Sequence, residues 1–402
     1  MAEQLSILVA ARDEQERIGP TVAALREAFP EAEVIVADDG SRDGTAAEAE
    51  AAGARVLRLP RRGKGQALAL AEREAEEGPL LLCDADLAGD LRPLIESDAD
   101  LAIAVFAEKQ GGGFGIVKRA AGELLRLTAR RELREPLSGQ RALSPAARRA
   151  VFPTAAGFGC DARMTRDAVL AGAVVEEIEL PLRHRATGRD LRGFAHRARQ
   201  LRDVLLAFGP QATNHRGLRL PLAGWIIGAL EPRVAGVAAI GLADDLFAGQ
   251  ERGFAAHLRS GRTTGVLKLV GIPLLGLLAT RKVSGALLVG LAANALNQLD
   301  TKPGRALKAY ALAAIPLGAP LAPVVILAPY DLREMAMLGD SGSNALGALL
   351  GLSSVDRLTG RGRWLAIGAL AALNLLGERT SLNDTIKRSP FLNAVDRLGR
   401  QA

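Results

Sequence analysis

The sequence predicts a chain in two parts: an α/β domain with a mainly parallel sheet over residues 1–207, and an all-α, multi-span membrane domain over residues 208–402. In the first half, short apolar strands alternate with helical stretches, which is typical of a parallel sheet with crossover helices. After about Leu218 the sequence becomes rich in Ala, Leu and Gly and carries few charges. That change of composition favours helices that cross a membrane.

Four strands are expected in the first 90 residues, and a polar cluster follows each of them. The strands begin near residues 5, 34, 55 and 80, and the clusters cover residues 12–14, 38–39, 61–64 and 84–86. Ligands of such sheets bind beyond the carboxyl ends of the strands, so these clusters are expected to share one edge. The sequence therefore predicts a ligand site at that edge.

The fourth cluster, Asp84-Ala85-Asp86, is predicted to hold a metal ion. A strand points residues i and i+2 to the same side, so both carboxylates are expected on one side of the strand end. They repel each other unless a cation lies between them. Hard oxygen ligands suit Mg²⁺ or Mn²⁺, with positions left open for substrate phosphates. On these three residues alone, a solvated Asp-rich turn is the alternative.

Two other clusters suggest nucleotide binding. Asp38 and Asp39 follow a strand and can accept hydrogen bonds from a base or a ribose. Lys64 lies between two glycines at an expected helix start, a place suited to phosphate. For Lys64, a solvated surface charge is the alternative.

Composition narrows the classes of function. The net charge of +6 comes mostly from arginine, and there is neither aromatic interleaving nor a nucleic-acid motif. The basic excess is therefore expected to serve anionic lipid and phosphate groups, with no nucleic acid as partner. Cys83 and Cys160 suggest no disulfide framework, which fits a reducing, cytosol-facing location. Residues 1–6 show no signal-peptide pattern.

Four ordered motifs in the first half resemble those of family 2 glycosyltransferases, most closely the dolichyl-phosphate-sugar synthase type. They are AARDEQERI at 10–18, DDGSRDGT at 38–45, GKG at 63–65 and DADL at 84–87. The resemblance implies a GT-A fold and a nucleotide-sugar donor. It also implies that Asp84 and Asp86 bind the metal and that Glu14 and Asp39 lie near the nucleotide. Ala88 stands where these synthases often carry Gln, which leaves the third metal ligand open.

Later residues supply acceptor candidates. Lys118 and Arg119 follow a glycine-rich loop, and they either receive an acceptor phosphate or lie on a solvated helix face. Arg141 belongs to a segment that resembles the family's Ser-Gly-x-Arg segment near the acceptor. Asp161 belongs to GFGCD, which resembles the family segment that offers an acid near the sugar. If the acceptor is a hydroxyl, Asp161 is the candidate base.

A strand over residues 174–182 leads into a cationic loop with His184 and Arg185. A lone histidine is usually structural or a surface residue; at this strand end His184 is alternatively the missing metal ligand or a contact to the diphosphate. Arg185 is a further phosphate-binding candidate. The basic amphipathic helix that follows suits an anionic membrane surface.

In the second half, six apolar stretches suggest five or six spans, although several are shorter than the roughly 20 residues that cross a bilayer. A soluble Ala-rich helical bundle is the alternative. Acids at the ends of such helices are functional candidates. The segments GLADD, NALNQLD and GDSGS resemble polyprenyl-phosphate sugar-1-phosphate transferases. That resemblance implies that Asp244, Asp245 and Asp340 hold Mg²⁺ and a lipid phosphate in a catalytic site, with Asn297 and Asp300 nearby.

Together these features predict a metal-dependent glycosyltransferase, bound to the membrane, that moves a sugar from a nucleotide sugar to a lipid-linked acceptor, polyprenyl phosphate, in cell-envelope glycan synthesis. Two alternatives concern the second half. It is either a second enzyme that transfers a sugar-1-phosphate to polyprenyl phosphate, or a non-catalytic module that binds lipid and forms a homodimer. The expected location is the inner or plasma membrane, with the glycosyltransferase domain on the cytoplasmic side.

Overall fold

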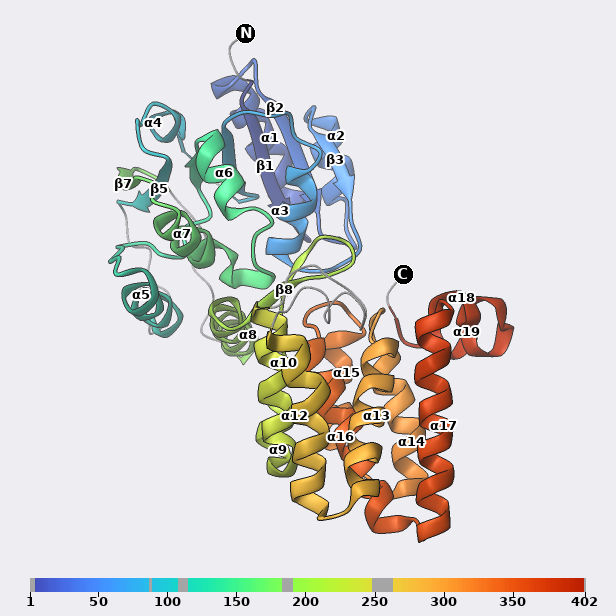
Figure 1. Ribbon diagram of the computed structural model, residues 1–402. Helices are drawn as coiled ribbons and strands as arrows, with labels where there is room; N and C mark the ends of the chain where they lie inside the picture. The colour runs from blue at the N-terminus through green and yellow to red at the C-terminus, as the bar shows by residue number, and fades with distance from the viewer. Residues whose placement is uncertain (1–3, 87–88, 108–114, 183–190, 248–262, 401–402) are drawn as a thin grey trace. The chain divides into compact units, whose positions relative to one another are not determined.

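The computed structural model describes residues 4–86, 89–107, 115–182, 191–247 and 263–400, and Figure 1 shows them as ribbons. The chain separates into two compact units. The first comprises residues 1–209 and 217–219, and the second comprises residues 210–216 and 220–402. Each unit has its own hydrophobic core.

A seven-stranded sheet in the order β3-β2-β1-β4-β6-β5-β7 forms the middle of the first unit. Its strands are β1 (Ser6–Ala11), β2 (Glu33–Asp38), β3 (Arg55–Arg58), β4 (Leu80–Asp84), β5 (Leu101–Phe106), β6 (Arg141–Leu143) and β7 (Val175–Leu180). Neighbouring strands are parallel except β6, which runs antiparallel to β4 and β5. Because β2, β1 and β4 are adjacent and parallel, the loops that follow them share one edge. The α/β prediction for the first half is confirmed.

Helices cover both faces of this sheet because its strands are apolar on both sides. Ile7 and Val9 of β1 pack into the core that contains Ile18 of α1, whereas Leu8 packs into the opposite core with Leu68 of α3. The helices of the first unit are α1 (Gln15–Ala28), α2 (Thr45–Ala51), α3 (Lys64–Glu72), α4 (Arg92–Ile95), α5 (Ile116–Ala129), α6 (Pro145–Val151), α7 (Cys160–Leu170) and α8 (Leu191–Phe208), with a 3₁₀ turn η1 (Gly157–Gly159).

The second unit is helical, with a small sheet of β8 (Gln211–Thr213) and β9 (Arg219–Pro221) near its start in the sequence. Its described helices are α9 (Ile226–Leu230), η2 (Pro232–Val234), α10 (Ala235–Phe247), α12 (Thr263–Thr280), α13 (Val283–Leu299), α14 (Arg305–Leu317), α15 (Ala322–Asp331), α16 (Gly339–Arg357), α17 (Gly360–Arg379), α18 (Leu382–Arg388) and α19 (Pro390–Arg397). Helix α16 lies at the centre, buried from Ser341 to Val355. A Cβ at Gly347 would lie 2.5 Å from the carbonyl carbon of Ala292, so α16 packs directly on the backbone of α13.

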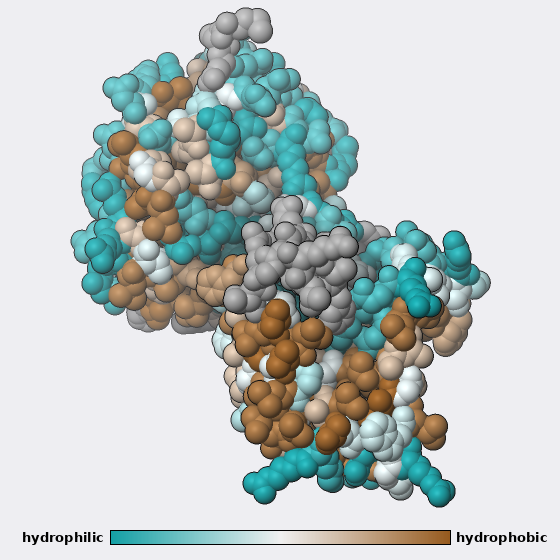
Figure 2. Space-filling model, in the orientation of Figure 1, coloured by the Kyte–Doolittle hydropathy of each residue, from teal (hydrophilic) through white to brown (hydrophobic). Residues whose placement is uncertain are grey.

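The prediction of a multi-span membrane domain is wrong. Within the described residues, no helix combines the length and the apolar character that crossing a bilayer requires. Helices α10, α14 and α15 have 13, 13 and 10 residues, whereas a span needs about 20. Figure 2 shows apolar side chains gathered on the surface of the second unit. Exposed apolar residues of α12 are Leu267, Val270, Leu274 and Leu278. The composition that suggested spans therefore belongs partly to exposed faces of shorter helices.

Candidate active site

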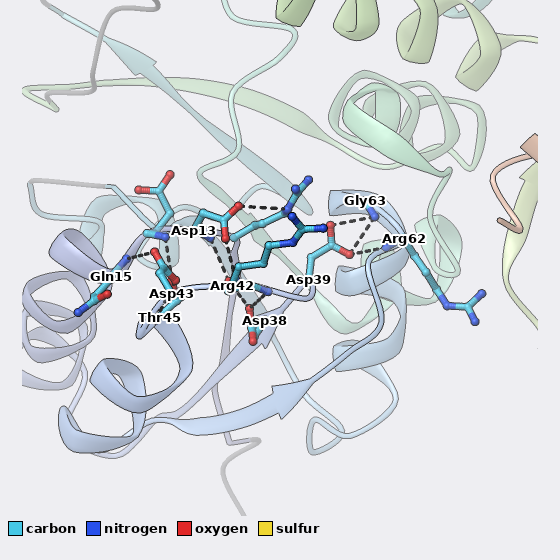
Figure 3. A network of polar contacts seen from close by, with 12 residues as sticks. Asp13, Gln15, Asp38, Asp39, Arg42, Asp43, Thr45, Arg62 and Gly63 are labelled. Carbon is cyan, nitrogen blue, oxygen red and sulfur yellow. Dashed lines mark hydrogen bonds and ion pairs between the residues drawn. The ribbon is translucent and has the colours of Figure 1, made fainter. Parts of the chain in front are cut away.

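A network of polar contacts fixes the loops that follow β1 and β2, as Figure 3 shows. Asp13 Oδ1 accepts a hydrogen bond from the backbone N–H of Arg42 at 2.9 Å. Asp38 Oδ1 accepts from the backbone N–H of Ser41 at 3.0 Å and from the Ser41 hydroxyl. Asp38 was predicted to bind the nucleotide, and one of its oxygens is thus engaged by its own loop.

Asp39 holds the backbone in front of α3. Its side chain is buried, and its carboxylate accepts hydrogen bonds from the backbone N–H groups of Arg62 at 2.6 Å and Gly63 at 2.9 Å (Figure 3). Burial raises the pKa of Asp39, and these two hydrogen bonds oppose the rise. Gly63 has a φ of 97°, a conformation that favours glycine. Asp39 therefore fixes the backbone next to Lys64.

Glu14 lies at the same edge, between β1 and α1. Its backbone N–H donates to Thr45 Oγ1 at 2.8 Å, and its carboxylate pairs with Arg17. The hydrogen bond that Arg17 donates to Glu14 is the main cause of the raised pKa of Arg17. The Glu14 side chain is 27% exposed, so a ligand at this edge can reach it.

Three charged side chains meet beyond β4. Lys64 Nζ, at the start of α3, donates to Asp84 Oδ1 at 2.9 Å and to Asp161 Oδ2 of α7 at 2.9 Å. The other oxygen of Asp84 accepts from Gln140 Nε2 at 3.1 Å. Burial lowers the pKa of Lys64, but the charges of Asp161 and Asp84 outweigh it and raise the pKa above its usual value. Lys64 therefore stays protonated and places a positive charge between the two carboxylates.

Two features of this cluster fit a divalent metal ion. Asp161 Oδ1 is buried and has no hydrogen-bond partner in the described structure, so one carboxylate oxygen is left for a ligand. A Cβ at Gly139 would lie 2.5 Å from Asp84 Oδ1, so the glycine makes the room in which this carboxylate lies. Carboxylate oxygens are the ligands that Mg²⁺ prefers.

Asp86 lies in a turn, two residues after β4 ends at Asp84, and its side chain is half-buried. Strand alternation therefore does not extend to Asp86, and a turn sets the direction of its side chain instead. Among the described side chains, no three His, Cys, Asp or Glu groups form a metal site. Mg²⁺ commonly takes one or two protein carboxylates and fills its other positions with water and substrate phosphates. The arrangement fits a metal–phosphate site rather than a closed protein cage.

The acceptor candidates on α5 lie outside this cluster. Lys118 pairs with Glu135 at 2.5 Å and remains 42% exposed, and Arg119 is exposed. Ile116 and Leu127 on the same helix are 58% and 69% exposed. Helix α5 therefore presents both cationic and apolar side chains to solvent.

Arg141 is fully buried at the start of β6. Its guanidinium donates to the backbone oxygen of Ser138 at 2.6 Å, to Thr165 Oγ1 at 2.7 Å and to the backbone oxygen of Pro136 at 3.1 Å. These contacts tie the segment before β6, which carries Gln140, to α7. The Arg141 side chain has no access to solvent in this structure, so it offers no surface to an acceptor here. Acceptor binding by Arg141 stays a prediction. His184 and Arg185 lie outside the described residues.

A cavity of about 790 Å³ in the second unit is lined by the five residues predicted for a second site, Asp244, Asp245, Asn297, Asp300 and Asp340. Asp245 accepts hydrogen bonds from the backbone N–H groups of Asp340 at 2.9 Å and Ser341 at 3.0 Å. A Cβ at Gly241 would lie 2.5 Å from the backbone oxygen of Asp340, so the glycine lets α10 and α16 approach. Close helix packing thus brings together acids that lie 95 residues apart in the sequence.

Sequence reasoning missed Lys268, which lines the same cavity from α12. Its Nζ donates to Asp244 Oδ2 at 2.8 Å and to Asp340. Burial, followed by the charge of Asp340, raises the pKa of Asp245 to about 7. The signal was visible: Lys268 is the one charged residue in an apolar stretch over residues 266–280. Such a lysine needs an anionic partner when it is buried.

Residues 6–136 match the model of Glycosyl transferase family 2. The matched stretch contains β1 to β5 and the residues Glu14, Asp39, Lys64, Asp84 and Asp86. The predictions of a family 2 glycosyltransferase domain and of a glycosyltransferase enzyme are confirmed. A comparison with curated proteins finds no match.

Solved structures of glucosyl-3-phosphoglycerate synthase from Mycobacterium tuberculosis are similar to this chain. The complex with phosphoglyceric acid is 23% identical, with 55% of this chain and 86% of that chain covered and a TM-score of 0.43. The complex with Mn²⁺, uridine diphosphate and phosphoglyceric acid is 25% identical, with 51% and 78% covered and a TM-score of 0.43. The complex with Mg²⁺ and uridine diphosphate is 24% identical, with 51% and 79% covered and a TM-score of 0.42.

Proposed function

We propose that the first unit transfers a sugar from a nucleotide diphosphate sugar to a polyprenyl phosphate, with Mg²⁺ or Mn²⁺ held by Asp84 and Asp86. The observation that carries the proposal is the cluster of Lys64, Asp84 and Asp161 beyond β4. It lies within a sheet whose first five strands match the family 2 glycosyltransferase model.

Each side chain at this edge has a role that its contacts allow. When bound, the metal neutralises the departing diphosphate. Asp39 fixes the backbone before α3, so that Lys64 starts from a defined position next to the diphosphate. Glu14 and Asp38 lie at the ends of β1 and β2, where a base or ribose would bind.

A phosphate acceptor suits the side chains on α5. Lys118 and Arg119 offer positive charge, and the exposed Ile116 and Leu127 offer apolar surface on the same helix. A polyprenyl phosphate carries both an anionic head and a hydrocarbon chain. It is already anionic at neutral pH and needs no strong base, and Asp161 then serves to position Lys64. With a hydroxyl acceptor, Asp161 would be the base.

The test is a transfer assay on the purified chain with labelled nucleotide sugars and Mn²⁺. UDP-glucose is the first donor to try, because a mycobacterial synthase structure contains it. Polyprenyl phosphate and 3-phosphoglycerate are offered as separate acceptors. We expect label in the lipid, and a loss of at least about 100-fold in Asp84→Asn. Asp90→Asn is the matched control, because Asp90 is exposed and bonds to Arg92 just beyond the site.

The outcomes separate the parts of the proposal. If 3-phosphoglycerate takes the label and the lipid does not, the acceptor assignment is wrong while the transferase assignment stands. If Asp84→Asn keeps full activity, the metal site lies elsewhere. The cellular location, the homodimer and the role in envelope synthesis stay predictions.

A second candidate function concerns the cavity of the second unit. It brings Asp244, Asp245, Asn297 and Asp340 together, which favours transfer of a sugar-1-phosphate to polyprenyl phosphate there. Release of UMP from a UDP-sugar, lost in Asp244→Ala and kept in Asp84→Asn, is the result expected of such an enzyme. Absence of UMP release from the wild-type chain would leave the cavity a binding site without this chemistry.

A further inference from the structure

The ammonium group of Lys64 lies between two carboxylates, which are groups that also bind metal ions. Its Nζ lies 2.9 Å from Asp84 Oδ1 and 2.9 Å from Asp161 Oδ2. The Lys64 side chain is 14% exposed and that of Asp161 is 5% exposed, so little water screens these two charges, whereas the Asp84 side chain is 34% exposed. One ammonium group thus contacts two carboxylates, both of which also interact with the charge of the buried Arg141, and the second oxygen of Asp161 has no hydrogen-bond partner in the described structure.

A bare divalent cation that approaches Asp84 meets this ammonium group. The positive charge repels the incoming ion, and the hydrogen bond from Lys64 to Asp84 must be broken before that carboxylate can turn to a metal. A cation that is bound to a nucleotide diphosphate is repelled less, because the diphosphate is negatively charged. Its phosphate oxygens can also accept hydrogen bonds from the ammonium group of Lys64.

We propose that Lys64 acts as an internal counter-ion that makes this site select a metal–nucleotide complex over the bare metal. In the donor-free protein Lys64 neutralises Asp84 and Asp161. When the metal and the nucleotide diphosphate bind together, Lys64 exchanges Asp84 for a phosphate oxygen, Asp161 keeps its contact with Lys64, and Asp84 turns to the metal. The inference rests on the proposed function of the first unit and adds the order in which its ligands bind.

The local structure allows the exchange without a change of fold. Asp39 holds the backbone at Arg62 and Gly63, so the start of α3 stays in place. The four-carbon side chain of Lys64 then rotates on a fixed base, and its charge moves while its backbone does not. Gln140, which donates to Asp84 at 3.1 Å, keeps part of that carboxylate's hydrogen bonding during the exchange.

The test measures Mn²⁺ binding by the full-length chain, from the electron paramagnetic resonance signal of the free ion, with and without UDP. An opposite charge beside a carboxylate shifts its proton affinity by about one to three pKa units. The same charge acts on a metal ion, so Lys64→Met should bind bare Mn²⁺ at least about tenfold more tightly than the wild type. In the wild type, UDP should strengthen Mn²⁺ binding strongly, and in Lys64→Met this coupling should shrink by a similar factor.

Arg58→Met is the matched control, because it also removes one positive charge from the first unit, and Arg58 pairs with Glu50 at the surface. It should leave Mn²⁺ binding unchanged. Lys64→Gln removes the same charge but keeps an amide that can donate to a carboxylate. It replaces Lys64→Met in the test if that variant does not fold, and the same changes in Mn²⁺ binding are expected. Circular dichroism checks the fold of each variant.

Three results are decisive. Tighter bare-Mn²⁺ binding in the Lys64 variants with weaker UDP coupling supports the inference. Unchanged or weaker bare-Mn²⁺ binding in a folded Lys64 variant, while the wild type transfers sugar with Mn²⁺, overturns the inference and leaves the proposed function standing. A folded wild type that binds no Mn²⁺ with UDP and transfers no sugar overturns both.

Discussion

The substitution Gly139→Ala tests how tightly the segment before β6 encloses Asp84. Gly139 has no positive φ, so alanine adds no backbone strain. Its Cβ would lie 2.5 Å from Asp84 Oδ1, whereas ordinary contact begins at 3.4 Å, so the carboxylate must retreat by about 0.9 Å. Lys64 and Gln140 hold that carboxylate at 2.9 and 3.1 Å, and such a retreat disrupts both contacts.

A misplacement of about 1 Å at a reacting site costs about 100-fold in rate, and we expect that loss in kcat/KM for Mn²⁺-dependent transfer. Overpacking should also lower the free energy of unfolding by about 1–3 kcal/mol. The assay is steady-state transfer together with thermal unfolding. Gly122→Ala on α5 is the control, because nothing lies within 4 Å of its Cβ. A folded Gly139→Ala protein with wild-type kcat/KM would refute the position given to Asp84.

Three further predictions concern stability. Arg141→Met removes three buried hydrogen bonds and should lower the free energy of unfolding by about 3 kcal/mol in chemical denaturation; a change below about 1 kcal/mol would contradict the bracing role. Gly347→Ala places its Cβ 2.5 Å from the carbonyl carbon of Ala292 and should lower the melting temperature of the second unit, while Gly368→Ala, with open space around its Cβ, should not. Burial acts to raise the pKa of Asp396, but hydrogen bonds from Arg305 and Arg400 outweigh it and hold the pKa below its usual value. Its stabilising contribution is therefore complete above about pH 4 and falls as the pH drops further. Asp396→Asn should therefore reduce the fall of the melting temperature between about pH 4 and more acidic values. An unchanged fall would count against this ion pair.

The edge of the sheet could be predicted because each early strand ends in a polar cluster. Parallel strands place their carboxyl ends together, and this rule alone brings Glu14, Asp39 and Asp84 to one edge. The exact role of Asp39 could not be predicted, since a carboxylate that braces backbone N–H groups and one that binds a ribose have the same sequence pattern. Its burial and its two backbone hydrogen bonds support the bracing role, and nucleotide binding by Asp39 stays a prediction.

In the second half of the chain, the sequence predicted residues of the cavity but not the kind of fold that forms it. The motifs around Asp244 and Asp340 indicated residues that do line one cavity, because glycines at 241 and 339 permit close packing at that point. The membrane prediction failed because hydropathy does not show where a helix ends: α10, α14 and α15 have 13, 13 and 10 residues, fewer than the roughly 20 that a span needs. Lys268 was missed for a related reason: its partners lie on α10 and α16, far from it in the sequence.

Crystals of the chain grown with Mn²⁺ and UDP, measured at a wavelength where manganese scatters anomalously, would test the central claim most directly. We expect an anomalous peak at about 2.0–2.4 Å from a carboxylate oxygen of Asp84 or Asp86, next to the diphosphate, with Lys64 Nζ turned from Asp84 to a phosphate oxygen. A diphosphate bound away from β4, or manganese found only among the acids of the second unit, would contradict it.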